Sequence, residues 1–128
     1  EREEEEDDAG EDTQRQPTLT LDNKEATKFV SFFKAMEPAP PRTIRFFSRK
    51  RDGEYYTCHG SDALYIAAEC YHTNAVIKGL GKDSELPSCT VSIANFHSFV
   101  TQLLTERQHR VEVWGESKGS WSVIQLPG

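Results

Sequence analysis

In three segments, apolar residues recur three and four positions apart, the spacing that places side chains on one face of a helix. In the first segment these residues are Phe29, Val30, Phe33 and Met36. Residues that cap helix amino termini (Ser, Asp or Asn) stand at the start of each segment. We therefore expect three helices: from a cap at Asp22 or Asn23 to about Met36, from about Asp62, with Ser61 as its cap, to Tyr71, and from a cap at Ser92 or Asn95 to about Arg107.

Six further segments are rich in β-branched and aromatic residues or alternate between apolar and polar residues, as strands do. They are residues 43–48, 55–58, 76–80, 88–93, 110–114 and 121–126. We expect residues 81–87 to form a polar loop and residues 115–120 a turn. One helix followed by two strands, three times over, predicts an α/β (α+β) domain. Its mixed β-sheet of about six strands is flanked by three helices.

The acidic residues are concentrated at the amino terminus. Residues 1–12 contain nine acidic residues and one arginine, a net charge of −8, and the remainder carries +2. Residues 1–16 have no apolar residue except Ala9, so they cannot bury enough surface to offset the entropy of ordering. We expect residues 1–16 to be a disordered acidic tail and residues 17–128 to be the folded domain. Such a tail is a solubilising leader or a competitor of DNA for a basic patch.

Residues with catalytic or metal-binding chemistry are scattered along the chain. The four histidines lack the spacing of zinc ligands, and the three cysteines have no close pairing, which favours reduced thiols. No glycine-rich loop ends in Lys-Ser or Lys-Thr, and the acidic residues of the folded part are dispersed. No apolar run approaches the ~20 residues of a membrane span. We therefore expect a domain without catalytic activity, cofactor or membrane contact.

The hairpin between the first two predicted strands is a candidate binding site. The pair Asp52-Gly53 marks its turn, and the tip is too polar to be buried. Cations neutralise phosphates and an aromatic ring can stack on an unstacked base, so this pattern suits a polyanion; a solvated turn without a ligand is the simpler interpretation. Consecutive strand residues point to opposite faces, so only one of the two tyrosines can face outward. The residues concerned are Arg45, Arg49, Lys50, Arg51, Tyr55 and Tyr56.

Several runs of the sequence resemble the amino-terminal, mismatch-binding domain of the MutS family. The runs include Ile44-Arg45-Phe46-Phe47, Gly53-Glu54-Tyr55-Tyr56-Thr57, His59-Gly60-x-Asp62-Ala63-Leu64, Ala75-Val76-Ile77-Lys78-x-Leu80-Gly81 and Leu103-Leu104-x-x-Arg107-Gln108-x-Arg110-Val111-Glu112-Val113. The resemblance looks closest to the second eukaryotic homologue. It implies a fold like MutS domain I in a larger nuclear protein, whose ATPase, with its ATP and magnesium, lies outside this domain.

The resemblance also implies a role in DNA mismatch repair. The family reads a mispaired base with a Phe-x-Glu motif, which falls here on residues 55–57, and Thr57 lacks the carboxylate. The chain is therefore expected to belong to the supporting subunit of a heterodimer with the sixth or third homologue, contacting the backbone of double-stranded DNA that carries a mismatch or an insertion loop. The alternative is a domain that docks the partner subunit with little DNA contact. The expected DNA-binding residues are Tyr55, Tyr56, Thr57, Arg45, Arg49, Lys50, Arg51 and Lys78.

Overall fold

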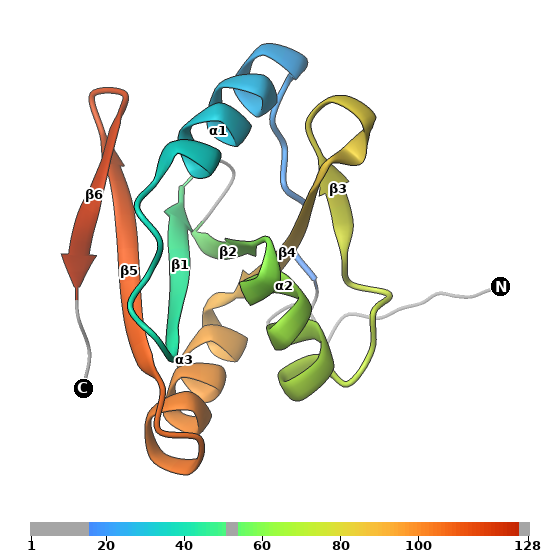
Figure 1. Ribbon diagram of the computed structural model, residues 1–128. Coiled ribbons are helices and arrows are strands. Elements are labelled where there is room, and N and C mark those ends of the chain that lie inside the picture. Colours follow the sequence, from blue (N-terminus) through green and yellow to red (C-terminus); the bar gives the residue numbers. More distant parts are fainter. Residues whose placement is uncertain (1–15, 51–53, 126–128) are drawn as a thin grey trace, which may run out of the picture.

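The computed structural model describes residues 16–50 and 54–125, whose strands form one sheet in the order β3-β4-β2-β1-β5-β6 (Figure 1). Strands β1 and β5 are parallel and all other neighbours are antiparallel, so the predicted mixed six-stranded sheet is confirmed. The predicted tail, up to residue 15, and the hairpin tip with Arg51 lie outside the described residues. The elements are α1 (Asn23–Ala35), β1 (Thr43–Arg49), β2 (Tyr55–His59), α2 (Ser61–Ile66), η3 (Ala67–Tyr71), β3 (Lys78–Leu80), η4 (Lys82–Ser84), β4 (Leu86–Ser92), α3 (Ile93–Thr101), η5 (Gln102–Glu106), β5 (Arg110–Ser117) and β6 (Ser120–Gln125).

Helix α1 covers one face of the sheet. It begins with a capping box, in which the Asp22 carboxylate accepts a hydrogen bond from the Glu25 amide at 2.7 Å and Glu25 accepts one from the Asp22 amide at 3.0 Å. Its buried Phe29 packs against Phe47 of β1, with the two rings edge to face at 5.4 Å between centroids. The apolar stripe predicted from the sequence is thus the face that α1 turns toward the sheet.

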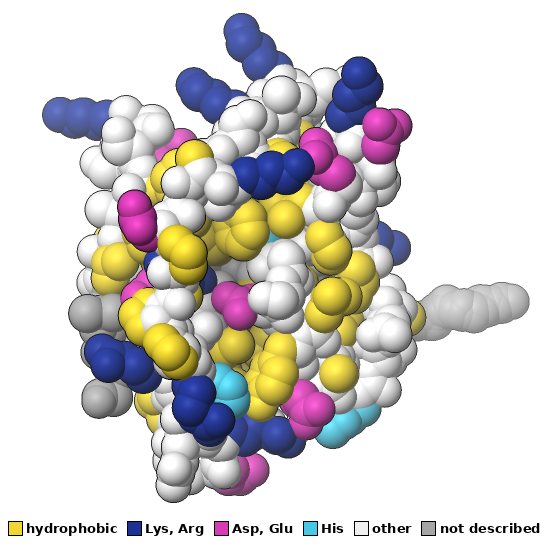
Figure 2. All heavy atoms as spheres, in the orientation of Figure 1, with side chains coloured by type: hydrophobic (Ala, Val, Ile, Leu, Met, Phe, Trp, Pro, Cys, Tyr) yellow, Lys and Arg dark blue, Asp and Glu magenta, His cyan; other side chains and the backbone are white. Residues whose placement is uncertain are grey.

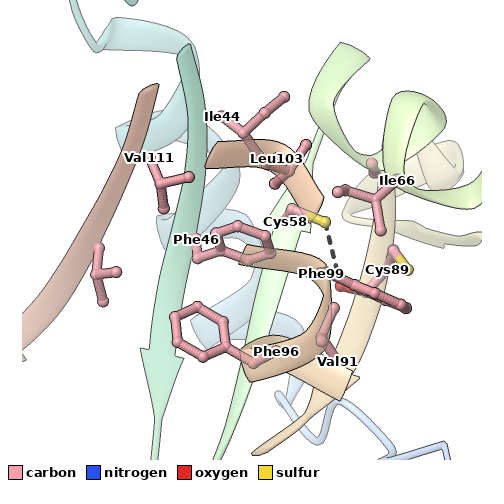
Figure 3. Close-up of a cluster of buried hydrophobic side chains, with 12 residues drawn as sticks. Ile44, Phe46, Cys58, Ile66, Cys89, Val91, Phe96, Phe99, Leu103 and Val111 are labelled. Atoms are coloured by element: carbon pink, nitrogen blue, oxygen red, sulfur yellow. Dashed lines mark hydrogen bonds between the residues drawn. The ribbon is translucent and has the colours of Figure 1, made fainter. Parts of the chain in front are cut away.

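Helices α2 and α3 cover the opposite face, and they lie in the lower part of Figure 1, apart from α1 in the upper part. Apolar side chains form the core cluster on this face, and Figure 3 shows part of it, including Phe46 of β1, Ile66 of α2 and Leu103 of η5. These three side chains are fully buried. Each contributes about 1.5–3 kcal/mol through removal of its apolar surface from water.

The start of α2 differs from the prediction. The cap residue is Gly60 and not Ser61, and no side chain caps this end. Gly60 has φ = 67°, and a β-carbon there would lie 3.3 Å from the Phe33 ring, so glycine suits this position. Asp62 in the first turn instead accepts a hydrogen bond from the Arg45 amide at 3.0 Å, which attaches α2 to β1.

Several element boundaries also differ from the prediction. Strand β4 begins at Leu86, inside the expected polar loop, and β3 is only three residues long. Strands β5 and β6 reach Ser117 and Ser120, so the expected turn over residues 115–120 is only two residues long. The second and third helices both end in a π-helical turn. In the described part of the chain, no helix is both long and apolar enough to cross a lipid bilayer.

Candidate nucleic-acid interface at the first hairpin

Strand alternation divides the hairpin residues between the two faces of the sheet. Arg45 and Arg49 of β1 share the α1 face with Phe47. Strand β2 places Tyr55 and Thr57 on this same face and Tyr56 on the opposite one. The hairpin therefore presents its two tyrosines to different surroundings, as the sequence predicts.

Arg49 is buried, so the expectation that the whole basic tip is solvated is wrong. Its side chain is 9% exposed, and its guanidinium carbon lies 4.5 Å from the centroid of the Phe29 ring and 5.0 Å from that of Trp121. A flat guanidinium stacks on aromatic rings in this way. Burial lowers the pKa of Arg49 to about 10, although Tyr55 and Glu116 favour its charge.

Arg49 is the outer end of a buried chain of hydrogen bonds. Its Nε donates to Thr57 Oγ1 at 3.2 Å, and Thr57 Oγ1 lies 2.8 Å from His59 Nε2. His59 Nδ1 lies 2.7 Å from Ser88 Oγ, which donates to the Leu86 carbonyl at 3.2 Å. Because the Ser88 hydroxyl uses its proton toward Leu86, its oxygen accepts a hydrogen bond from His59 Nδ1, and the neutral imidazole therefore carries its proton on Nδ1. Accordingly, the pKa of His59 is well below 6.5, first because of burial and then because of the Arg49 charge.

The two positions that we expect to match the family's mismatch reader, Tyr55 and Thr57, lie inside the fold. Thr57 is fully buried and Tyr55 is 6% exposed. Tyr56 is half-buried and stacks on Phe96 of α3, with 3.8 Å between ring centroids and 13° between ring planes. Burial, followed by the charge of Glu54, raises the pKa of Tyr56. Of the two tyrosines, Tyr56 is the one with substantial exposed surface.

The remaining expected DNA-binding residues do not form one patch. The Arg45 side chain is only 13% exposed, with Nε 2.9 Å from the Glu112 carboxylate and Nη1 donating to the Glu37 carbonyl at 2.9 Å. Lys50 is exposed beside the tip. Lys78 is exposed on β3, in the cross-strand row of Ser88 and His59 at the far end of β2 from Tyr55. Of the cations expected to contact DNA, Arg45 and Arg49 therefore turn inward, whereas Lys50 and Lys78 are exposed.

Metal and thiol chemistry find no support in the described residues. No group of three His, Cys, Asp or Glu side chains within residues 16–50 and 54–125 could hold a metal ion. The Cys58 thiol is buried, and its hydrogen bond to Cys89, together with burial, raises its pKa well above the usual value. A thiol in this state is a poor nucleophile.

Comparisons of the sequence with protein families and with known proteins agree with one another. Residues 27–124 match the MutS domain I family. The DNA mismatch repair protein MSH2 of Arabidopsis thaliana is 38% identical over 117 residues, which are 90% of this chain and 12% of that protein. MSH2 of Zea mays is 36% identical over 85% of this chain and 11% of its own length. The DNA mismatch repair protein spellchecker 1 of Drosophila melanogaster is 32% identical, over 88% of this chain and 12% of its own length. The chain thus spans about 12% of the length of these relatives.

Proposed function

The chain belongs to the MutS domain I family, and from this premise we propose that it serves DNA mismatch repair as the non-reading first domain of an MSH2-type subunit. In this role the domain is not catalytic. The partner subunit, a second MutS homologue of the sixth or third type, reads the lesion in duplex DNA. The ATPase, with ATP and magnesium, belongs to parts of the protein outside this chain, and the site of action is the nucleus.

The observation that carries the proposal is the burial of the reader positions. A wedge and a base-contacting carboxylate must both reach the stacked bases. Here Tyr55 is 6% exposed and Thr57 is fully buried, with its hydroxyl oxygen engaged by Arg49 and His59. Neither side chain is available to a base, so recognition of the lesion falls to the partner subunit.

The DNA contact of this domain is then a contact with the phosphate backbone. Lys50 is the exposed cation among the described residues of the hairpin. We expect Arg51, the next residue, to contribute a second positive charge to the phosphate contact. A contact of this kind is independent of base sequence and weakens as salt rises. The inward placement of Arg45 and Arg49 favours the alternative in which DNA contact is minor and the domain mainly docks the partner subunit.

The test uses the full-length heterodimer with Lys50→Ala, Tyr55→Phe and, as a matched surface control, Lys82→Ala. Fluorescence anisotropy measures binding to a matched duplex and to one with a single mismatch at several salt concentrations. We expect Lys50→Ala to weaken binding to both duplexes equally and to reduce the salt slope by about 1. Tyr55→Phe, which keeps the buried ring, should leave the ratio of the two affinities unchanged. A changed ratio in either variant would contradict a non-reading role.

A further inference from the structure

A cavity of about 900 Å³ lies between α1, the tip ends of β1 and β2, and the β5–β6 hairpin. These elements converge in the upper left of Figure 1. Its walls include the rings of Phe32 and Trp121 and the side chain of Ile124, and Arg49 also lines it. Polar and charged side chains of α1, the first hairpin and the β5–β6 hairpin make up much of the remaining lining, and a volume of this size lies in the range of ligand-binding sites.

Arg49 is an unusual residue for such a lining. It is nine-tenths buried, and within residues 16–50 and 54–125 no carboxylate lies within ion-pair distance of it, although the charge of Glu116 on the cavity rim favours its charged form. Its hydrogen-bond partners there are the Thr57 hydroxyl at 3.2 Å and the neutral His59 ring at 3.5 Å. Buried charges are normally paired, because desolvation of an unpaired charge is costly. A cation in this state, facing a cavity, indicates an anionic ligand.

The rim of the cavity shows which kind of anion fits. Lys28 and Lys50 line it together with Glu25 and Glu116. Figure 2 shows that dark-blue and magenta side chains also stand near one another along the upper edge of the face that it draws. A rim of mixed charge repels a dense row of phosphates as much as it attracts one, whereas a single carboxylate among apolar groups suits it.

Strand β6 adds a second recognition element. It is an edge strand, and the Ile124 side chain that lines the cavity is 59% exposed. Edge strands accept extended peptides through main-chain hydrogen bonds, and alternate side chains of the peptide then enter the neighbouring pocket. We propose that this cavity docks an extended peptide segment of a partner protein, with an Asp or Glu carboxylate on the Arg49 guanidinium and apolar neighbours on Trp121 and Ile124.

The test begins with selection of a randomised short-peptide library on the 128-residue chain, with Lys82→Ala as a control variant and Arg49→Met as the test variant. We expect enriched peptides to carry an acidic residue beside apolar ones, on the native chain and on Lys82→Ala but not on Arg49→Met. Enrichment of peptides without an acidic residue, or no enrichment, would overturn the proposal, as would equal enrichment on Arg49→Met.

A binding cycle then separates the carboxylate contact from any loss of folding. One enriched peptide is compared with its acid-to-amide counterpart on the native chain and on Arg49→Met, using tryptophan fluorescence. The amide should bind the native chain about tenfold more weakly, and the two peptides should bind Arg49→Met equally. If Arg49→Met does not fold, the comparison of the two peptides on the native chain alone tests the contact, because equal affinity for the acidic peptide and its amide counterpart would refute it. Displacement of the peptide by a DNA duplex would also refute it.

Discussion

The two faces of this sheet differ in what fills them. On the α2 and α3 face the interior is apolar, and Figure 3 shows Phe46 there among aliphatic and aromatic neighbours. On the α1 face a buried chain of hydrogen bonds joins Arg49, Thr57, His59 and Ser88, and Phe29 packs on the His59 ring. The stability of the first face depends mainly on how well its side chains fill the space, whereas that of the second depends on each polar group of the chain keeping its hydrogen-bond partner.

This difference bears on the proposed function, because the positions that we expect to match the family's mismatch reader fall on the polar face. The Thr57 hydroxyl accepts a hydrogen bond from Arg49 and contacts His59, so it is already hydrogen-bonded inside the fold. The cavity whose lining includes Arg49 borders the same face. Internal hydrogen bonding therefore occupies one end of this face, and the cavity lies at the other.

The largest expected effect comes from a cavity in the apolar face. Phe46→Ala removes a fully buried ring that packs edge to face on Phe96 at 5.1 Å. We expect the free energy of unfolding, measured by urea denaturation, to fall by about 3–5 kcal/mol. Leu64→Ala, at a site that is 48% exposed, should change it by less than about 0.5 kcal/mol. Similar losses in both variants would mean that this face is not the tightly packed core.

A reciprocal exchange of a hydroxyl and a methyl group sharpens the comparison. Thr57→Val deprives Arg49 and His59 of their shared partner, and Val91→Thr places a hydroxyl in the apolar core, where the native side chain is fully buried. Each change should lower the free energy of unfolding by about 1–3 kcal/mol, because each leaves a buried polar group unsatisfied. Thr57→Ser, which keeps the hydroxyl, should cost less than Thr57→Val. A neutral Thr57→Val would show that the hydrogen-bonded chain is not essential.

The fold could be predicted largely from the sequence, because its signals are local. The spacing of Phe29, Val30 and Phe33 predicted α1, and strict alternation after Arg110 predicted β5. The extension of β5 and β6 through Gly115 and Ser120 was not predicted, since pairing between two strands overrides the turn preference of those residues. The cap of α2 was missed because the helix begins one residue earlier than predicted, so that Ser61 is its first residue and Gly60 occupies the cap position.

The candidate site was predicted only in part. The absence of a carboxylate at Thr57 and the opposite orientation of the two tyrosines follow from residue type and alternation. Which tyrosine is more exposed depends on Phe96, a residue distant in sequence that stacks on Tyr56. The burial of Arg49 depends on Phe29 and Trp121, which come from α1 and β6. One signal was available in the sequence, because alternation places Arg49, Phe47, Thr57 and His59 on the same face.

The smallest expected effect is a pH dependence that separates the two faces. His59 has a pKa well below 6.5 in the folded chain, so the unfolded chain takes up its proton first as pH falls. Its contribution to stability is therefore complete above pH 6.5 and declines below it, by at most about 1.4 kcal/mol per pH unit. Asp62 has the opposite sign, because burial raises its pKa from 3.8 to about 6. Its contribution is complete below pH 3.8 and is lost as pH rises to about 6.

Urea unfolding of the native chain, His59→Gln and Asp62→Asn between about pH 7.5 and about pH 4 tests these opposite signs. Between pH 6.5 and 6 the loss in the native chain comes mainly from His59, so His59→Gln should flatten the curve there. Below about pH 6 the Asp62 gain offsets part of that loss, and Asp62→Asn should make the decline steeper. A flat native curve that neither variant changes would mean that His59 is not held neutral by burial and Arg49. The hydrogen-bonded chain on the α1 face would then make no pH-dependent contribution to stability.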